Sequence, residues 1–116
     1  MRTASRKAKG RKLQNTVRDV ILDFFPDLTE DDVRVAIMGE TGADIKLSKK
    51  AKDLLNICIE CKNQEGIKKI YDFYEQAVNH GKGETPATLI MKSNRRSPLV
   101  VIDLLDFMGI LSDARK

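Results

Sequence analysis

The chain has few aromatic residues with which to build a core: its 116 residues include four Phe, two Tyr and no Trp. Aliphatic side chains must therefore supply most of the buried area of the fold. No apolar run reaches the roughly 20 residues that a bilayer-spanning helix needs, and no apolar segment follows the basic N-terminus as it would in a signal peptide. With 41% hydrophobic and 33% charged residues, the composition predicts a soluble intracellular domain with no membrane partner.

Acidic residues are absent from the first twelve positions, whereas the other 104 residues hold 15 basic and 17 acidic side chains. This uneven charge predicts a basic N-terminal arm, residues 1–12, ahead of one domain over residues 13–116. Such an arm is suited to a phosphate backbone, and a solubilising tail is the alternative. The six basic residues of the arm are Arg2, Arg6, Lys7, Lys9, Arg11 and Lys12.

The chain has only two cysteines, and their C-x-x-C spacing raises the question of zinc or redox chemistry. Cys58 and Cys61 lie in the short alternating stretch 56–62, whose β-branched residues favour a strand. Side chains three positions apart on a strand face opposite sides of the sheet. The pattern therefore predicts two ordinary strand residues that neither share a metal nor bridge each other.

Hydrophobic periodicity predicts the element order α-β-β-β-α-β-β-α, which is typical of an α/β or α+β fold with helices flanking a mixed central β-sheet. A tight turn at Gly39–Gly42 is expected to join the first two strands. The segment 48–55 is compatible with a short helix or a loop. The expected helices are 13–24, which Pro26 terminates, 67–81, which Gly81 and Gly83 terminate, and 103–108; the expected strands are 33–38, 43–47, 56–62, 87–91 and 99–102.

Three charged residues fall on neighbouring predicted strands: Asp44, Glu60 and Lys62. On a strand, Glu60 and Lys62 project from the same face, and Asp44 can point to that face from the next strand. Two carboxylates beside a lysine suit Mg²⁺-assisted phosphodiester hydrolysis, because carboxylates bind a hard cation that also takes water and phosphate oxygens. A cross-strand ion pair is the plain alternative. A rival register uses Lys46 of the triplet 44–46, with Glu40 ahead of it.

Three motifs carry a family resemblance: Lys9-Gly10-Arg11-Lys12-Leu13-Gln14 at the start of a helix, Gly42-Ala43-Asp44-Ile45, and Ile59-Glu60-Cys61-Lys62-Asn63. Together they resemble the PD-(D/E)XK nuclease superfamily, in particular archaeal-type Holliday junction resolvases and small phage-encoded endonucleases. The resemblance implies a restriction-endonuclease-like fold in which Asp44, Glu60 and the Cys61 carbonyl hold Mg²⁺, with Mn²⁺ able to replace it. It implies a catalytic role for Lys62. Gln14 stands where the family usually has a metal-site Glu.

The resemblance implies a metal-dependent endonuclease that cuts branched DNA and works as a homodimer in the cytoplasm, or in the host cytoplasm if phage-encoded. No separate base-reading motif is visible, so selectivity for DNA structure is expected. Two other functions remain open: an inactive nucleic-acid-binding module of nuclease fold, and a sequence-specific homing or restriction-type nuclease. The residues expected to contact DNA phosphates are Arg6, Lys7, Lys9, Arg11, Lys92, Arg95 and Arg96.

Overall fold

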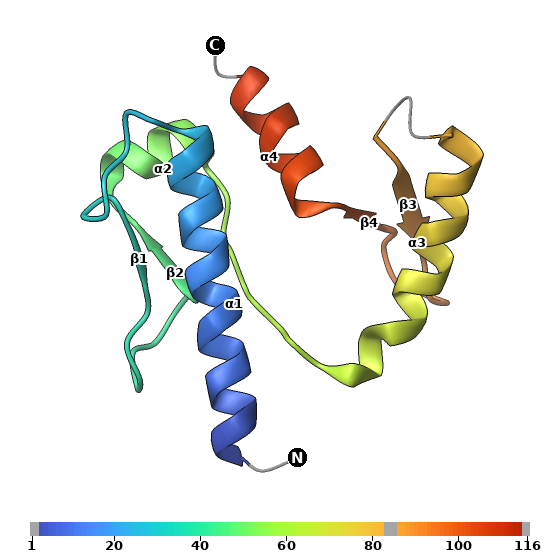
Figure 1. Ribbon diagram of the computed structural model, residues 1–116, viewed down its shortest axis with the longest axis horizontal. Coiled ribbons are helices and arrows are strands. Elements are labelled where there is room, and N and C mark those ends of the chain that lie inside the picture. The colour runs from blue at the N-terminus through green and yellow to red at the C-terminus, as the bar shows by residue number, and fades with distance from the viewer. Residues whose placement is uncertain (1–2, 83–85, 115–116) are drawn as a thin grey trace. The chain divides into compact units, whose positions relative to one another are not determined.

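The computed structural model describes residues 3–82 and 86–114 (Figure 1). Two positions used in the sequence predictions, Arg2 and Gly83, lie outside these ranges. The chain divides into two compact units. Unit 1 comprises Met1–Asn63 and Met108–Lys116, and unit 2 comprises Gln64–Phe107. Among the described residues, no helix is long and apolar enough to span a membrane.

Helix α1 (Thr3–Phe24) is the longest element of unit 1. Val17 and Ile21 are buried one turn apart, which gives the helix one apolar face. The helix ends before Pro26, since the residue preceding a proline disfavours the helical conformation. It begins ten residues before the predicted start at Leu13, so the charge boundary at residue 12 is not a structural boundary. The described basic positions of the predicted arm belong to this helix.

Strands β1 (Val33–Val35) and β2 (Ile45–Leu47) form an antiparallel hairpin that packs on α1. Val33 and Ile45 are almost completely buried, so the hairpin and α1 share one core. Helix α2 (Lys49–Leu55) follows, and this resolves the open choice at 48–55. Its N-cap is Ser48, whose hydroxyl oxygen accepts from the Ala51 N–H at 3.1 Å and donates to the Asp32 carboxylate at 2.7 Å.

Unit 2 is built from a helix and a second hairpin. The 3₁₀ turn η1 (Glu65–Ile67) leads into α3 (Lys68–Gly81), which packs on β3 (Thr88–Met91). Strand β4 (Leu99–Ile102) pairs antiparallel with β3. The Tyr74 hydroxyl of α3 donates to the Ala87 carbonyl at 2.9 Å and accepts from the Asp103 N–H at 3.0 Å, so one side chain joins the helix to the open end of the hairpin, next to both strands.

Helix α4 (Leu104–Asp113) starts in unit 2, and its residues from Met108 onward belong to unit 1. Its first turn is capped by the Asp103 carboxylate, which accepts from the N–H groups of Leu105 at 2.8 Å and Asp106 at 3.2 Å. The predicted helix 103–108 is therefore present and longer than expected. The predictions for α3, β3 and β4 are also confirmed.

The predicted single mixed sheet is wrong: the described chain has four helices and two separate two-stranded antiparallel hairpins. The predicted strand at 56–62 is also wrong, because this segment has no strand pairing and its backbone is irregular. The alternating pattern is nevertheless real. Ile57, Ile59 and Cys61 are half-buried, whereas Asn56, Cys58, Glu60 and Lys62 are exposed.

Candidate functional site

Asp44 immediately precedes β2 and joins the β1–β2 hairpin to the irregular segment 57–63. Its N–H donates to the Ile59 carbonyl at 3.1 Å, and its Oδ2 accepts from the Cys61 N–H at 2.7 Å. In a regular parallel ladder, the Cys61 N–H would donate to the backbone carbonyl of Asp44. The Asp44 carbonyl instead accepts from the Ala36 N–H at 2.9 Å. Asp44 therefore replaces a ladder bond with its side chain, and this places its carboxylate beside Glu60-Cys61-Lys62.

Glu60 and Lys62 are both exposed, although no strand holds this segment. The described residues provide neither side chain with a hydrogen bond or ion pair. Cys61 is half-buried. Burial raises the pKa of the Cys61 thiol, and the negative charges of Asp44 and Glu60 raise it further. Both carboxylates therefore act electrostatically on the same thiol.

The rival lysine of the triplet 44–46 is committed elsewhere. The Lys46 ammonium donates to the Thr41 carbonyl and lies against Gly42, where an added Cβ would sit 2.8 Å from its Nζ. This contact draws Lys46 onto the β1–β2 turn and favours Lys62 as the lysine of the site.

Glu40, the other acid of the rival register, is paired with Arg34 through two bonds of 3.0 and 2.8 Å. Hydrogen bonding from Arg34 and from the Ile37 N–H lowers the pKa of Glu40 to about 2. The sequence predictions do not include this pair. Opposite charges six positions apart, one on the predicted strand 33–38 and one in the predicted turn Gly39–Gly42, are the signal that could have found it.

Gln14 lies half-buried on α1. Val17 and Ile21 follow it at i+3 and i+7, so it continues the helix face that packs on the first hairpin. No hydrogen bond joins Gln14 to Asp44 or Glu60 within the described part of the chain. The structure thus puts Gln14 on the expected face and leaves its role in a metal site as a prediction.

The donor set fits a hydrated Mg²⁺ better than a closed metal cage. Within residues 3–82 and 86–114, no three His, Cys, Asp or Glu side chains are grouped to hold a metal ion. Mg²⁺ commonly binds one or two carboxylates and keeps several waters. Asp44 retains one oxygen beyond its bond to Cys61, Glu60 retains both, and the Cys61 carbonyl would add a third oxygen donor, as the family resemblance implies. These residues would hold the ion.

The predicted DNA-contacting residues fall in two groups. Lys7, Lys9 and Arg11 are exposed on the N-terminal half of α1, and Arg6 lies on the same helix. Lys92, Arg95 and Arg96 are exposed in unit 2, at the end of β3 and in the turn toward β4. Arg95 has φ of 63°, and the Arg96 N–H closes the turn on the Ser93 carbonyl at 3.2 Å.

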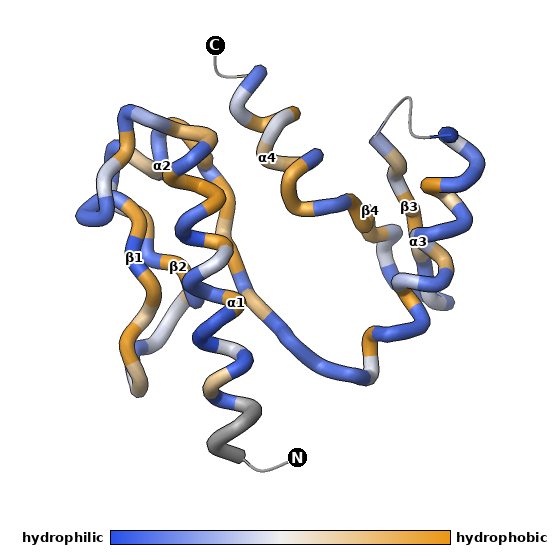
Figure 2. Tube along the Cα trace, viewed as in Figure 1, coloured by the Kyte–Doolittle hydropathy of each residue, from blue (hydrophilic) through white to orange (hydrophobic). Residues whose placement is uncertain are grey.

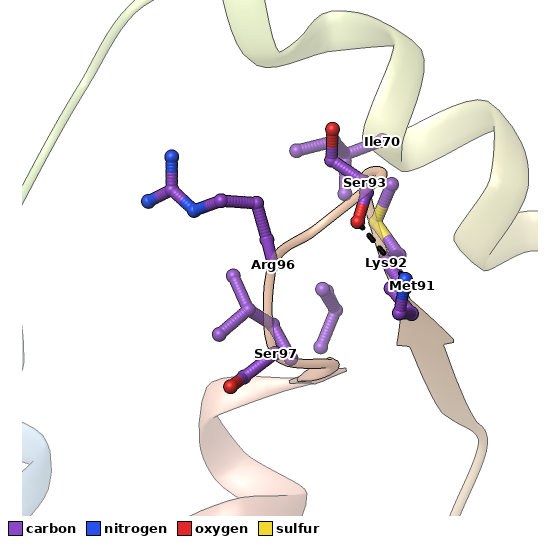
Figure 3. Close-up of a pocket in the computed structure, with 8 residues that line it drawn as sticks. Ile70, Met91, Lys92, Ser93, Arg96 and Ser97 are labelled. Carbon is purple, nitrogen blue, oxygen red and sulfur yellow. Dashed lines mark hydrogen bonds between the residues drawn. The ribbon is translucent and has the colours of Figure 1, made fainter.

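A cavity of about 590 Å³ lies at this basic turn (Figure 3). Apolar side chains of α3 and of both strands line it, including Ile70, and Lys92 and Arg96 contribute the charge of its rim. The Lys92 ammonium donates to the Ser93 carbonyl at 3.3 Å. No acidic residue lines the cavity, which suits an anionic group such as phosphate.

Comparison of the chain with protein-family models, with curated proteins and with solved structures gave no match.

Proposed function

We propose that this chain is a Mg²⁺-dependent endonuclease that hydrolyses phosphodiester bonds in branched DNA, in the manner of the Holliday junction resolvases that its motifs resemble. One observation carries the proposal: the 2.7 Å hydrogen bond from the Cys61 N–H to the Asp44 carboxylate. It holds the Asp44 carboxylate at the backbone of Cys61, between the exposed residues Glu60 and Lys62. Two carboxylates and a lysine are a set of side chains that suits metal-assisted hydrolysis.

Each side chain has a distinct task in this proposal. The Cys61 amide fixes one oxygen of Asp44 and leaves the other to a ligand, while Glu60 supplies a second carboxylate from the exposed face. Mg²⁺ held there would lower the pKa of its bound water and stabilise the charge that develops on the phosphate. Lys62 is exposed two positions after Glu60, and its ammonium would donate to the attacking water or to a phosphate oxygen.

In this proposal, exposed lysine and arginine side chains bind the DNA phosphates. Lysine and arginine contacts to phosphates fix a protein's orientation on DNA without reading its sequence. Lys7, Lys9 and Arg11 offer such contacts from α1, and Lys92, Arg95 and Arg96 offer them from the β3–β4 turn. A chain that binds mainly through phosphates selects its substrate by DNA shape, which favours a structural target such as a junction.

The test is Mg²⁺-dependent cleavage of a four-way junction, a flap, a single strand and a linear duplex. Wild type is expected to cut the junction best. Asp44→Asn, Glu60→Gln and Lys62→Ala should each reduce the cutting rate by at least about a hundredfold, as is typical when an electrostatic stabiliser of the reaction is removed. Asp44→Asn is the sharpest variant, because its amide oxygen can still accept from the Cys61 N–H while the charge is gone.

Lys46→Ala is the matched control, because it removes a lysine two positions from Asp44 that the β1–β2 turn already occupies. We expect it to cut like wild type. Circular dichroism shows whether each variant is folded. Junction binding in EDTA shows whether it still binds DNA. Normal cutting by Lys62→Ala together with inactive Lys46→Ala would contradict the assignment and support the rival register.

A second candidate function is a DNA-binding module without catalysis. The observation that favours it is the small metal-binding set: two carboxylates, with neutral Gln14 on the helix face that packs toward the hairpin. This function predicts junction binding in EDTA and no cutting with Mg²⁺ or Mn²⁺.

A further inference from the structure

The tip of the β1–β2 connection presents two apolar side chains to solvent. Ile37 and Met38 are 70% and 75% exposed, more than any other large apolar residue in the described chain. Figure 2 shows the hydrophobic colour of β1 continuing to this tip. Surface turns usually carry Gly, Pro, Asn, Asp and Ser, and adjacent exposed apolar side chains are uncommon there. Two together, at the most exposed point of a turn, suggest a ligand.

The turn that carries these side chains is held rigidly. The Glu40 N–H donates to the Ile37 carbonyl at 3.0 Å, and Gly39, with φ of 85°, occupies the position that requires glycine in a type II turn. The Glu40 carboxylate also accepts from the Ile37 N–H at 2.9 Å and from both Arg34 guanidinium nitrogens. A turn braced in this way loses little further entropy when its tip inserts into a partner.

The turn is also bonded to the proposed metal site. The Ala36 N–H donates to the Asp44 carbonyl at 2.9 Å, so the residue between β1 and the tip is bonded to the proposed ligand. Ile37 and Met38 follow Ala36 directly. A residue spans at most about 3.6 Å of chain, so the backbone of Met38, two residues beyond Ala36, lies within about 10–12 Å of Asp44, which is about three base steps along DNA.

The charge distribution of unit 1 indicates which end faces nucleic acid. Residues 1–18 contain seven basic and no acidic side chains, whereas residues 19–32 contain six acidic and no basic ones. Helix α1 therefore carries its positive charge at its N-terminal end, where the helix dipole is also positive. In Figure 1 the β1–β2 turn extends toward this same end of the unit. The apolar tip thus projects from the cationic end, where a polyanion is attracted.

We propose that Ile37 and Met38 form a wedge that inserts between bases at the branch point of the DNA substrate. Apolar wedges of this kind unstack base steps, and unstacking costs least where pairing is already interrupted. The wedge rests on the proposed function, and it explains how a chain without base-reading elements selects a junction over a duplex. It also predicts that the cut falls within about three nucleotides of the branch, given the reach of the tip from Asp44.

The experiment compares Ile37→Ser/Met38→Ser with Ile90→Ser/Val100→Ser. The control pair faces each other across β3 and β4 and is similarly exposed, at 67% and 63%, but lies far from the turn in sequence and in the other unit. Binding is measured in EDTA, with 2-aminopurine at the branch of a four-way junction. We expect the wedge variant alone to lose roughly tenfold in its preference for junction over duplex, because two apolar side chains no longer bury surface against bases. Its fluorescence increase on binding should also be lost.

Three results would overturn the wedge. One is unchanged preference and fluorescence in the wedge variant, and another is an equal loss in both double variants. The third is a shift of the wedge variant from dimer to monomer in sedimentation without DNA, which would make the tip a protein interface. The binding measurement is made in EDTA and needs no metal, so these outcomes are separate from the proposed nuclease function. Failure of that function would appear as no cutting by wild type in Mg²⁺.

Discussion

The two units differ sharply in how they bury apolar side chains. Every buried side chain of the described residues belongs to unit 1, among them Ile21, Val33, Ile45 and Leu55. The described residues of unit 2 include no buried side chain, and Tyr71, Ile90, Leu99 and Val100 are exposed there. Unit 1 is therefore stabilised mainly by the hydrophobic effect. Unit 2 depends more on its hairpin pairing and on the hydrogen bonds of Tyr74.

The residues of the proposed chemistry belong to the unit with the buried core. Asp44, the segment 57–63 and the β1–β2 turn all lie in unit 1, and the two strands that flank the turn contribute Val33 and Ile45 to its core. A metal site and a wedge both lose function when their supports move, because small displacements of reacting groups cost large factors in rate. Unit 2 contributes cations at the β3–β4 turn, and phosphate contacts tolerate more movement.

Ile21→Ala should produce the largest loss of stability and gives the most direct test of the comparison. Ile21 is completely buried, so we expect its truncation to lower the free energy of unfolding by about 2–5 kcal/mol. Ile90→Ala removes the same atoms from an exposed position of β3 and should cost about 0.5 kcal/mol or less. Denaturant unfolding monitored by circular dichroism measures both. Similar losses in the two variants would show that unit 2 buries Ile90 as unit 1 buries Ile21.

Tyr74→Phe should have a smaller and local effect. It removes the hydroxyl that binds the Ala87 carbonyl and the Asp103 N–H, at a cost of about 1–2 kcal/mol. We expect faster hydrogen exchange at Asp103 and along β3, while the amide of Ile45 in unit 1 keeps its protection. Faster exchange at Ile45 as well would mean that the units unfold together and would contradict the separation.

The pH dependence of the β1–β2 turn should be the smallest effect. The folded pKa of Glu40 is about 2, below its ordinary value of 4.5, because Arg34 and the Ile37 N–H bind the carboxylate. A carboxylate whose pKa is lower in the folded than in the unfolded state stabilises the fold when the pH is above the unfolded pKa. This stabilisation is lost as the pH falls from about 4.5 toward 2. Melting temperatures between pH 7 and pH 3 should therefore fall more for wild type than for Glu40→Gln. Parallel curves would show that the Arg34 pair is not formed in solution.

Local patterns in the sequence predict local structure well here. The apolar spacing along α3 and the continuous apolar run of β4 each depend on neighbours within a few residues, and both elements are present. The first ten residues of α1 were not predicted as helix, because they are polar on every side and have no apolar stripe. Their helical structure adds to an element whose C-terminal half is anchored by Val17 and Ile21.

Pairing between distant segments is what the sequence could not supply. The alternation at 56–62 predicts alternating burial, and the exposed and half-buried residues of this segment do alternate. It does not tell whether a neighbouring strand offers free backbone groups, and here Asp44 offers a carboxylate instead. The same limit explains the error of one central sheet, since the partner of each strand is set by tertiary structure.

The central claim is that Asp44 and Glu60 form one metal site, and Mn²⁺ titration followed by NMR tests it most directly. Mn²⁺ broadens the resonances of nuclei near its binding site. The account predicts that the amides of residues 43–45 and 59–62, including Cys61, broaden first, and that Asp44→Asn abolishes this effect. Earliest broadening within the acidic stretch 27–32, unchanged by Asp44→Asn, would contradict the site.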